Sequence, residues 1–332
     1  MPSASFPDDL TVRAFTRREA RDLGVSNGSI QRQGLVRVTH GVHAVAGVEE
    51  GSRRAALLLG LPRGSAFSHT SAAALHDMPL TPRQLQRAGD EVMCPSGRGP
   101  IRRSGVRGHR GLESRAVTCR DGLPVVDAAD TWCDFGELVR RDGLSVDDLV
   151  VLGDAATNVV LRPERTAYDF EGIWPEPWAT TTLTERLEAQ ERRDLLARAE
   201  LFRRLDARCR PRGKRVLELA LPLIRSKVRS PTESRARLTF HWAGFPEPVV
   251  NLDIYAADGH WVAEGDLVWP EQMVIGEYQG AHHAERARAS ADADRRQRLD
   301  DHGWRTREIW AEDLFDRERR MAMLTRFDAL LS

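Results

Sequence analysis

The sequence predicts a multidomain α+β protein: an N-terminal winged helix-turn-helix, a mixed α/β middle region and a C-terminal α/β domain with a central mixed sheet. Three observations support this prediction. A chain of 332 residues is too long for one average domain and can hold two or three cores. The first 50 residues show two short helix patterns followed by a hairpin pattern. The last 120 residues show the order helix, three strands, helix, strand.

Domain boundaries are placed where the composition changes. Prolines interrupt the stretch from Tyr168 to Thr182, which predicts a linker. The next stretch, Leu183 to Arg208, is predicted to be a long charged helix that braces two domains. Its apolar residues on or near one stripe are Leu187, Leu195, Phe202 and Leu205. The predicted parts are residues 1–50, a middle domain at 51–165, the linker and bracing helix at 166–212, and the C-terminal domain at 213–332.

Composition excludes several classes of protein. Hydrophobic residues make up 41% and charged residues 30%, which is typical of a folded chain and too apolar for a disordered one. A net charge of zero argues against a polycation that coats nucleic acid, although local basic patches are compatible with it. The N-terminus has no signal-peptide pattern, and the longest apolar run, Ala55 to Leu61, is too short to span a bilayer. We therefore expect a cytoplasmic protein without a membrane partner.

The four cysteines carry no recognisable chemistry. They are scattered and form no C-x-x-C pair, so neither a disulfide framework nor a zinc knuckle is predicted. They are Cys94, Cys119, Cys133 and Cys209.

The N-terminal region follows the pattern of a helix-turn-helix with a wing. Thr16 and Glu19 form a T-x-x-E capping box, and a second helix is predicted from Ser26 to about Gln33. The segment LVRVTHGVHAV then alternates apolar and polar residues around a turn, which predicts a β-hairpin.

In a winged helix the second helix enters the major groove and flanking arginines meet phosphates. The candidate DNA contacts are Asn27, Ser29, Gln31 and Arg32 on the second helix, with Arg37 or His40 on the wing. The alternative is a small helical cap that packs on the next domain without contacting DNA.

The same region resembles a known family. The stretch FTRREARDLGVSNGSIQRQGLVRVTHGVHAV is similar to the N-terminal domain of the type IV abortive-infection antitoxins, with His43 where that family more often has Tyr. Further on, DGLPVVDAADTWCDF resembles the second half of the same proteins. The resemblance implies transcriptional regulation through a winged helix, with a cognate toxin as a candidate partner.

The middle region contains the clearest basic stretch of the chain. No acidic residue lies between Glu91 and Glu113, whereas five arginines do, and Arg102 and Arg103 are its candidate DNA contacts. A solvated loop and a strand that follows phosphates both explain the pattern. His69 and His76 are seven residues apart on a predicted helix, where a structural role is commoner than a metal-binding one.

The C-terminal domain places acidic residues on predicted strands. Asp266 lies on one strand, a turn follows at Pro270, and Glu277 shares a face of the next strand with Gln279. Converging carboxylates repel each other unless they share a proton or a cation, and hard divalent ions prefer carboxylate oxygens and water. A cation held there lowers the pKa of bound water and stabilises charge on a phosphate. The pattern therefore predicts a Mg²⁺ or Mn²⁺ site for phosphodiester hydrolysis.

A second resemblance covers roughly the last hundred residues. The residues that carry it are Glu233 in SPTESR, Asp266 in DLVWP, Glu277-Tyr278-x-Gly-x-x-His283, Asp294-Arg295-Arg296, Leu299, Gly303-Trp304 and Arg307. Together they look like the very-short-patch-repair endonuclease type, a branch of the PD-(D/E)xK nuclease superfamily. This resemblance implies a restriction-endonuclease-like fold. It also implies that Asp266 and Glu277 bind metal, that Glu233 joins or orients it, and that His283 lies near the scissile phosphate.

Two positions depart from the family pattern. Gln279 stands where the superfamily has Lys and this branch often has Asp, and an amide holds water without supplying charge. Glu264 stands where the branch often has Arg, so it is either an additional ligand or a solvent-facing residue.

Each acidic residue also has a purely structural explanation. Glu233 fits a helix cap after Ser230, Asp266 could cap a turn, and Glu277 could pair with Arg307. Four tryptophans are expected in core and edge packing first and in base stacking second: Trp261, Trp269, Trp304 and Trp310.

These patterns support a main hypothesis and two alternatives. The first is a DNA-binding protein with a magnesium-dependent endonuclease-like domain, in repair or defence against foreign DNA. Its candidate catalytic residues are Glu233, Asp266, Glu277, Gln279 and His283. The second is an antitoxin-type transcriptional regulator whose nuclease fold has lost catalysis, and the third is RNA processing. The sequence leaves the oligomeric state open.

Overall fold

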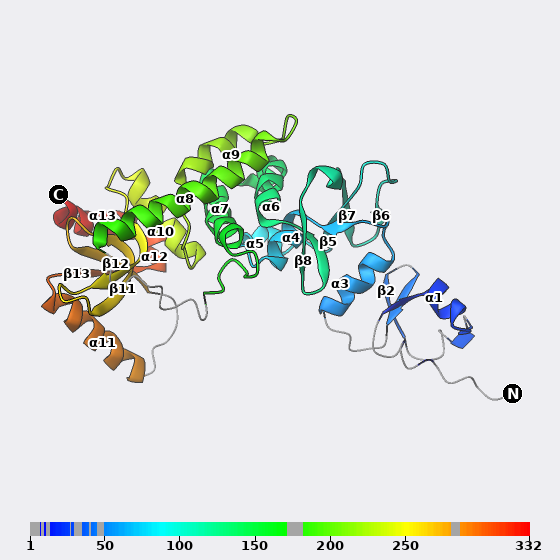
Figure 1. The fold of residues 1–332 in the computed structure, drawn as a ribbon, viewed down its shortest axis with the longest axis horizontal. Helices are drawn as coiled ribbons and strands as arrows, with labels where there is room; N and C mark the ends of the chain where they lie inside the picture. Colours follow the sequence, from blue (N-terminus) through cyan, green and yellow to red (C-terminus); the bar gives the residue numbers. More distant parts are fainter. Residues whose placement is uncertain are drawn as a thin grey trace. The chain divides into compact units, whose positions relative to one another are not determined.

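The computed structural model describes residues 7, 10, 14–26, 28–29, 35–39, 41–44, 50–170, 182–279 and 286–332. It is an α+β protein with three β-sheets in this part of the chain, which confirms the predicted class (Figure 1). The chain divides into two compact units. The first unit contains residues 1–76 and 80–135, and the second contains residues 77–79 and 136–332. No helix in the described ranges is long and apolar enough to cross a membrane.

The first unit begins with a small three-stranded sheet. Helix α1 (Arg17–Asp22) starts with the predicted capping box, in which Thr16 Oγ1 accepts a hydrogen bond from Glu19 N at 3.1 Å. The predicted hairpin is also present, because β2 (Val36–Thr39) and β3 (Val42–Ala44) pair antiparallel, and β1 (Phe15–Thr16) pairs with β3.

A six-stranded mixed sheet forms the rest of the first unit. Its strand order is β6-β7-β5-β4-β9-β8, and helices α4 and α6 pack together beside it. The strands are β4 (Ala66–Phe67), β5 (Asp90–Cys94), β6 (Arg102–Arg103), β7 (Val106–Arg110), β8 (Val117–Arg120) and β9 (Leu123–Val126). The helices are α3 (Glu50–Leu59), α4 (His69–Leu75), α5 (Pro82–Leu85) and α6 (Ala128–Asp134), with a 3-10 turn at Leu112–Ser114.

The second unit is built on a four-stranded mixed sheet in the order β10-β11-β12-β13. Its strands are β10 (Val249–Tyr255), β11 (Trp261–Trp269), β12 (Val274–Gln279) and β13 (Arg305–Trp310). The first three strands pair antiparallel, whereas β12 and β13 run parallel because α11 (Arg286–Asp301) lies between them in the chain. With α10 (Pro231–Trp242) before the sheet, the predicted order of helix, three strands, helix and strand is confirmed.

Helices cover both faces of this sheet (Figure 1). On one face α10 and α13 (Arg317–Leu331) contribute Phe240 and Phe327 to a core with Trp269 and Val274. On the other face Leu299 of α11 packs in a core with residues of β10, β11 and β12. Short α12 (Ala311–Phe315) follows β13.

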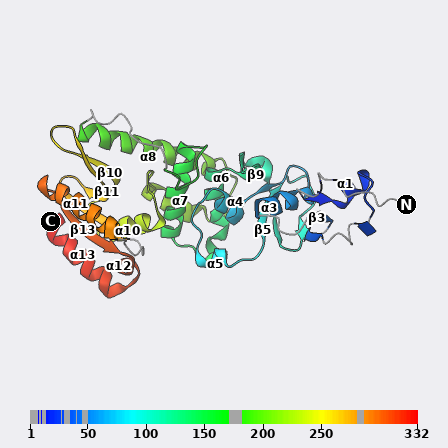
Figure 2. The same ribbon diagram turned by 90° about the horizontal axis from the view of Figure 1, so that it is seen from below.

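Three further helices belong to the second unit: α7 (Val146–Leu161), α8 (Leu183–Asp206) and α9 (Lys214–Ala220). Short segments of a 3-10 turn (Leu221–Leu223) and a π-helix (Val139–Gly143) accompany them, and another 3-10 turn spans Phe135–Glu137. Figure 2 shows α8 extending along the unit beside α7, in keeping with the contacts between the two helices.

The long charged helix was predicted correctly and its apolar stripe in part, because Leu187 and Leu205 pack inward. Leu195 and Phe202 are 54% and 51% exposed, whereas Ala197, Leu201 and Leu205 are buried. The buried face also contains a charge, because Asp194 Oδ1 accepts a hydrogen bond from Ser226 N at 2.7 Å. A polar residue therefore occupies a place in the stripe that the apolar pattern could not indicate.

Candidate functional site

Glu233 lies in the first turn of α10, and its side chain makes more hydrogen bonds than helix capping requires. Ser230 caps the helix by accepting from Glu233 N at 3.2 Å, and its hydroxyl donates to Glu233 Oε1 at 2.8 Å. The other oxygen, Oε2, accepts from Arg229 N at 2.9 Å and from Asn251 Nδ2 at 2.7 Å. Glu233 is buried, so helix capping alone does not explain a carboxylate held by donors from two elements.

Asn251 connects this carboxylate to the preceding loop. Its Nδ2 donates both to Glu233 Oε2 and to the carbonyl of Lys227, the latter at 2.9 Å. Asn251 and Lys227 both have positive φ angles, 48° and 65°. Positive φ is uncommon in residues other than glycine, and such positions concentrate at functional sites.

Asp266 links two strands rather than capping a turn. Its Oδ2, on β11, accepts a hydrogen bond from Tyr278 N of β12 at 2.8 Å.

Glu277 lies next to Tyr278 on β12 and is 5% exposed. Its Oε1 is 2.5 Å from Arg295 Nη1, so its ionic partner is on α11. The alternative pairing with Arg307 is wrong, because Arg307 Nη1 instead donates to the carbonyl of Thr306 at 2.8 Å.

Glu264 is a member of this group of acids and does not face solvent. It forms an ion pair with Arg229, and its backbone carbonyl accepts a hydrogen bond from Arg295. Its side chain is 20% exposed. Its Oε1 atom is buried without a hydrogen-bond donor among the described residues.

We call Glu233, Glu264, Asp266 and Glu277 the acid cluster. Burial raises the pKa of all four carboxyls above its ordinary value. The charge of Asp266 further raises the pKa of Glu233 and of Glu277, so these three acids share one electrostatic environment. The expected convergence is incomplete, however. Within the described ranges, no three members of the cluster have ligand atoms that all lie within 4.8 Å of one another.

The acid cluster contains more carboxyl groups than directly paired guanidinium groups. Its four carboxyls have two arginine partners, Arg229 and Arg295. Lys227, which lies 3.7 Å from Asp253, also acts electrostatically on Glu264, and Arg296 acts on Glu277. Carboxylate oxygens, including Glu264 Oε1, which has no hydrogen-bond donor among the described residues, are the donors that Mg²⁺ and Mn²⁺ prefer.

The remaining predicted catalytic positions are less informative. Gln279 is half-buried at the end of β12, two residues after Glu277, and lies in register with Trp310. His283 lies outside the described residues.

Among the predicted DNA contacts of the first unit, Asn27, Gln31, Arg32 and His40 also lie outside the described residues. Ser29 is described, and its hydroxyl is 3.0 Å from that of Ser26. Arg37 is exposed on β2. His43 on the neighbouring strand is buried, and burial followed by the charge of Arg17 lowers its pKa.

The basic stretch of the first unit forms a β-hairpin at the edge of its sheet. Arg102 is exposed and pairs in register with Arg107 across β6 and β7. Arg103 instead donates a hydrogen bond to the carbonyl of Gly60, so part of its guanidinium group is used within the unit.

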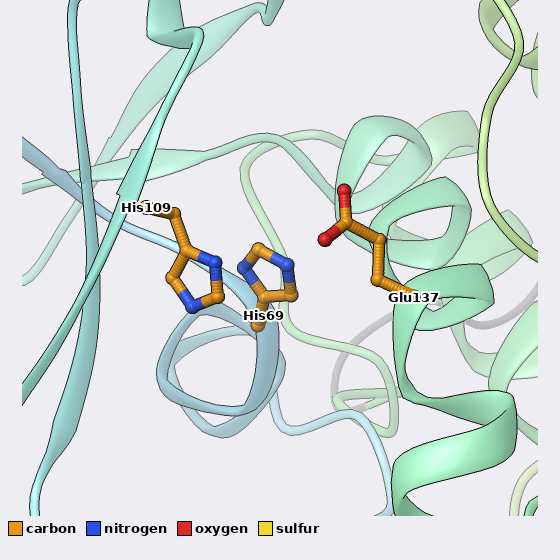
Figure 3. A group of neighbouring side chains, drawn as sticks. All are labelled: His69, His109 and Glu137. Carbon is orange, nitrogen blue, oxygen red and sulfur yellow. The ribbon is translucent and has the colours of Figure 1, made fainter.

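The two histidines considered from the sequence do not act together. His76 Nε2 lies 2.9 Å from the carbonyl of Val126, a structural contact. His69 stacks on His109 with ring centroids 3.7 Å apart, as Figure 3 shows; Glu137, also drawn there, belongs to the second unit. Glu91 lies 3.6 Å from His109 Nε2. Burial alone would raise the pKa of Glu91, but hydrogen bonding to His109 and the charge of His69 hold it well below its ordinary range.

The sequence did not indicate that Arg229 and Asn251 lie beside the acid cluster. It also did not indicate that Arg295 pairs with Glu277. Arg295 belongs to the Asp294-Arg295-Arg296 motif, but its partner could not be read from spacing. Arg229 lies immediately before the Ser230 cap, so its proximity to Glu233 could have been noticed. Asn251 lies on a predicted strand and gives no local signal of its positive φ angle.

Comparison of the chain with models of protein families, with curated proteins and with solved structures gives no match.

Proposed function

We propose that the protein is a DNA-binding phosphodiesterase whose second unit is a restriction-endonuclease-like domain dependent on Mg²⁺ or Mn²⁺. The observation that supports hydrolysis best is the acid cluster, in which Glu233, Asp266 and Glu277 share one electrostatic environment and burial disfavours their charged forms. The first unit would bind DNA through a winged helix, in keeping with its capped helix and its hairpin. A role in repair or in defence against foreign DNA follows from the family resemblance.

The residues of the acid cluster would have distinct roles. Asp266 and Glu277 would hold the cation, and Glu233, oriented by Asn251, would complete its ligands. The bound cation would lower the pKa of a water molecule and stabilise negative charge on the phosphate. Arg229 and Arg295 place guanidinium groups beside the acids, where they could bind phosphate oxygens. Gln279 could position water by hydrogen bonds but supplies no charge.

The test is nicking of supercoiled plasmid DNA by the full-length protein with Mg²⁺, with Mn²⁺ and with EDTA. We expect nicking that requires the cation and that Asp266→Asn abolishes, since Asn keeps the acceptor for Tyr278 N but loses the charge. The matched control is Asp258→Asn, an exposed position outside the acid cluster, which should retain activity. Absence of nicking with either cation would contradict the proposal.

A second candidate function is transcriptional regulation by a protein whose nuclease fold has lost catalysis. The ion pair of Glu277 with Arg295 favours it, because a guanidinium group already neutralises a proposed metal ligand. Gln279 favours it as well. Electrophoretic mobility shifts with DNA from the protein's own promoter distinguish the two functions. Specific, salt-sensitive binding without cleavage in Mg²⁺ would select the regulator.

A further inference from the structure

A basic groove runs along β13, the edge strand of the four-stranded sheet. It has a volume of about 690 Å³ and is bordered by α11, β13, α12 and α13. The lining residues used below are Arg296, Thr306, Arg307, Trp310, Arg319 and Arg326. We call this cavity the β13 groove.

The β13 groove has an excess of positive charge. Its lining contains four arginines and two acids, Glu308 and Asp313, and Arg319 also lies 3.9 Å from Glu312 beside the groove. Asp313 is shared by Arg319 at 3.3 Å and Arg326 at 3.9 Å, and Glu308 pairs with Arg296. Arg307 is exposed and has no acidic partner within 4 Å in the described part of the chain. Arginines in this arrangement are suited to phosphate groups, which accept paired hydrogen bonds from guanidinium.

Trp310 adds an aromatic surface to the same groove. Its side chain is 42% exposed, whereas Trp269 and Trp304 are buried at 1% and 9%. Somewhat less than half of Trp310 is therefore open to solvent and is not used in core packing. Exposed aromatic rings between arginines are typical of surfaces that stack the bases of single strands. Bases within a duplex are stacked on each other, so only an unpaired or flipped-out base could reach this ring.

The groove begins beside the acid cluster. In the parallel pairing of β12 with β13, Glu277 is in register with Glu308, and Gln279 is in register with Trp310. Arg296 lines the groove and also acts electrostatically on Glu277. A strand with one phosphate at the acid cluster could thus continue along β13.

We propose that the β13 groove binds a single-stranded segment of nucleic acid, with phosphates at its arginines and a base stacked on Trp310. This inference deepens the proposed function, because it names single-stranded nucleic acid as the ligand next to the acid cluster. It rests on that function only for the passage of the strand to the acids, since binding requires no hydrolysis.

Binding is measured by fluorescence anisotropy with the full-length protein, EDTA and a labelled oligothymidylate of about 12 nucleotides. Trp310→Ala should weaken binding about tenfold and Trp310→Phe should retain most of it, because the second change keeps a ring. Arg307→Glu should weaken binding and reduce its salt dependence. The matched controls are Trp242→Ala and Arg215→Glu, exposed residues outside the groove that should bind as the wild type does.

Cross-linking locates the strand independently of any binding by the first unit. An oligonucleotide with 5-iodouracil should cross-link to Trp310 on irradiation, as mapped by mass spectrometry of tryptic peptides. No cross-link in the β13 groove, or binding that neither variant alters, would overturn the inference. Equal competition by polyglutamate would also overturn it and would indicate a surface for acidic peptides.

The outcomes for the groove and for hydrolysis can be distinguished. Binding in EDTA without plasmid nicking would retain the groove and reject hydrolysis. Nicking with unaltered binding in the variants would reject only the groove.

Discussion

At the residue scale, the Glu277 carboxylate has an ionic partner, Arg295, in the structure and would be a ligand of the cation in the proposed site. Its 2.5 Å contact with Arg295 neutralises part of the acid cluster, while burial and the charge of Asp266 keep its pKa raised. A guanidinium group and a divalent cation would compete for the same oxygen atoms. In the proposed site, Arg295 would therefore limit cation affinity while it is paired with Glu277, and it would be available for phosphate once a cation replaced it.

Replacement of Arg295 tests this competition. We expect Arg295→Gln to raise the affinity for Mn²⁺ about tenfold, because one positive charge beside the ligands is removed. In EDTA the same change should lower the thermal stability, since Glu277 loses its ionic partner. Isothermal titration calorimetry measures the affinity, and Arg298→Gln, an exposed change on the same helix, is the control. Unchanged or weaker Mn²⁺ binding in Arg295→Gln would argue against competition.

The raised pKa values of the acid cluster predict a pH dependence of stability. An acid with a raised pKa takes up its proton in the folded state at a higher pH than in the unfolded state. Its unfavourable contribution is therefore complete above the raised pKa and disappears as pH falls toward the ordinary carboxyl value of about 4. Cation affinity should fall over the same window, because protons compete for the carboxylates.

Asp266→Asn isolates this effect. In EDTA at pH 8 the variant should be more stable than the wild type by about 1 kcal/mol, because it removes a carboxylate whose charged form is disfavoured by burial. The difference should vanish near pH 4, where the wild-type carboxyl is protonated as well. Thermal unfolding from pH 4 to pH 8 measures it, with the exposed Asp206→Asn as a control whose difference does not grow with pH. A variant less stable than the wild type at pH 8 would contradict the assigned cost of burying the Asp266 charge.

At the element scale, the start of α10 combines a helix cap with a buried carboxylate of the acid cluster. Ser230 accepts from the backbone of Glu233 and donates to its side chain, so the same hydroxyl sets the helix start and the position of the acid. The sequence presented helix capping and metal binding as alternatives for Glu233. The geometry shows that they are compatible.

Ser230→Ala separates the two roles when it is compared with a second cap in the same unit. Ser145 caps α7 in the same way, by accepting from Asp148 N at 3.1 Å. Each Ser→Ala change should cost about 1 kcal/mol of stability in chemical denaturation. Only Ser230→Ala should also weaken Mn²⁺ binding, because only Ser230 holds a member of the acid cluster. Equal Mn²⁺ affinity in the two variants would leave Ser230 as a cap alone.

Local patterns predicted the elements of the second unit better than they predicted its contacts. The hairpin of β11 and β12, the capped start of α10 and the helix and strand that follow, α11 and β13, all agree with the patterns of alternation, turn residues and capping residues. Ion-pair partners depend on how a helix lies across a sheet, which spacing does not encode. Glu277 was therefore matched with Arg307 on the neighbouring strand, whereas the helix above it supplies Arg295.

Exposure was the other property that local sequence could not provide. Core or edge packing was expected for all four tryptophans. Trp269 and Trp304 are in the core, whereas Trp261 and Trp310 lie outside it and are 55% and 42% exposed. All four lie in or next to strands, and their neighbours in sequence are similar. Their exposure depends on which helix covers each position, a property of the assembled unit.

At the scale of the whole molecule, the helices before the four-stranded sheet are part of its unit. Asp154 of α7 and Arg237 of α10 are both fully buried and lie 3.2 Å apart. Asp154 also accepts from Ser234 Oγ at 2.6 Å and from Arg225 N at 2.7 Å. Burial raises the pKa of Asp154 despite these partners, so the carboxylate depends on all of them. Removal of one member of such a buried pair costs about 3–5 kcal/mol.

Two fragments test how far this unit extends. Residues 136–332 should unfold cooperatively in urea, because they contain α7, α8 and the sheet. Residues 213–332 keep the predicted nuclease-like elements but lose Asp154, which leaves Arg237 buried without that partner. A loss of about 3–5 kcal/mol is a large part of the 5–15 kcal/mol that stabilises a typical domain. We therefore expect the shorter fragment to lack a cooperative transition by circular dichroism, and Arg237→Met within it to restore part of the folded signal. A shorter fragment that unfolds at the same urea concentration as the longer one would show that the sheet and its own helices suffice.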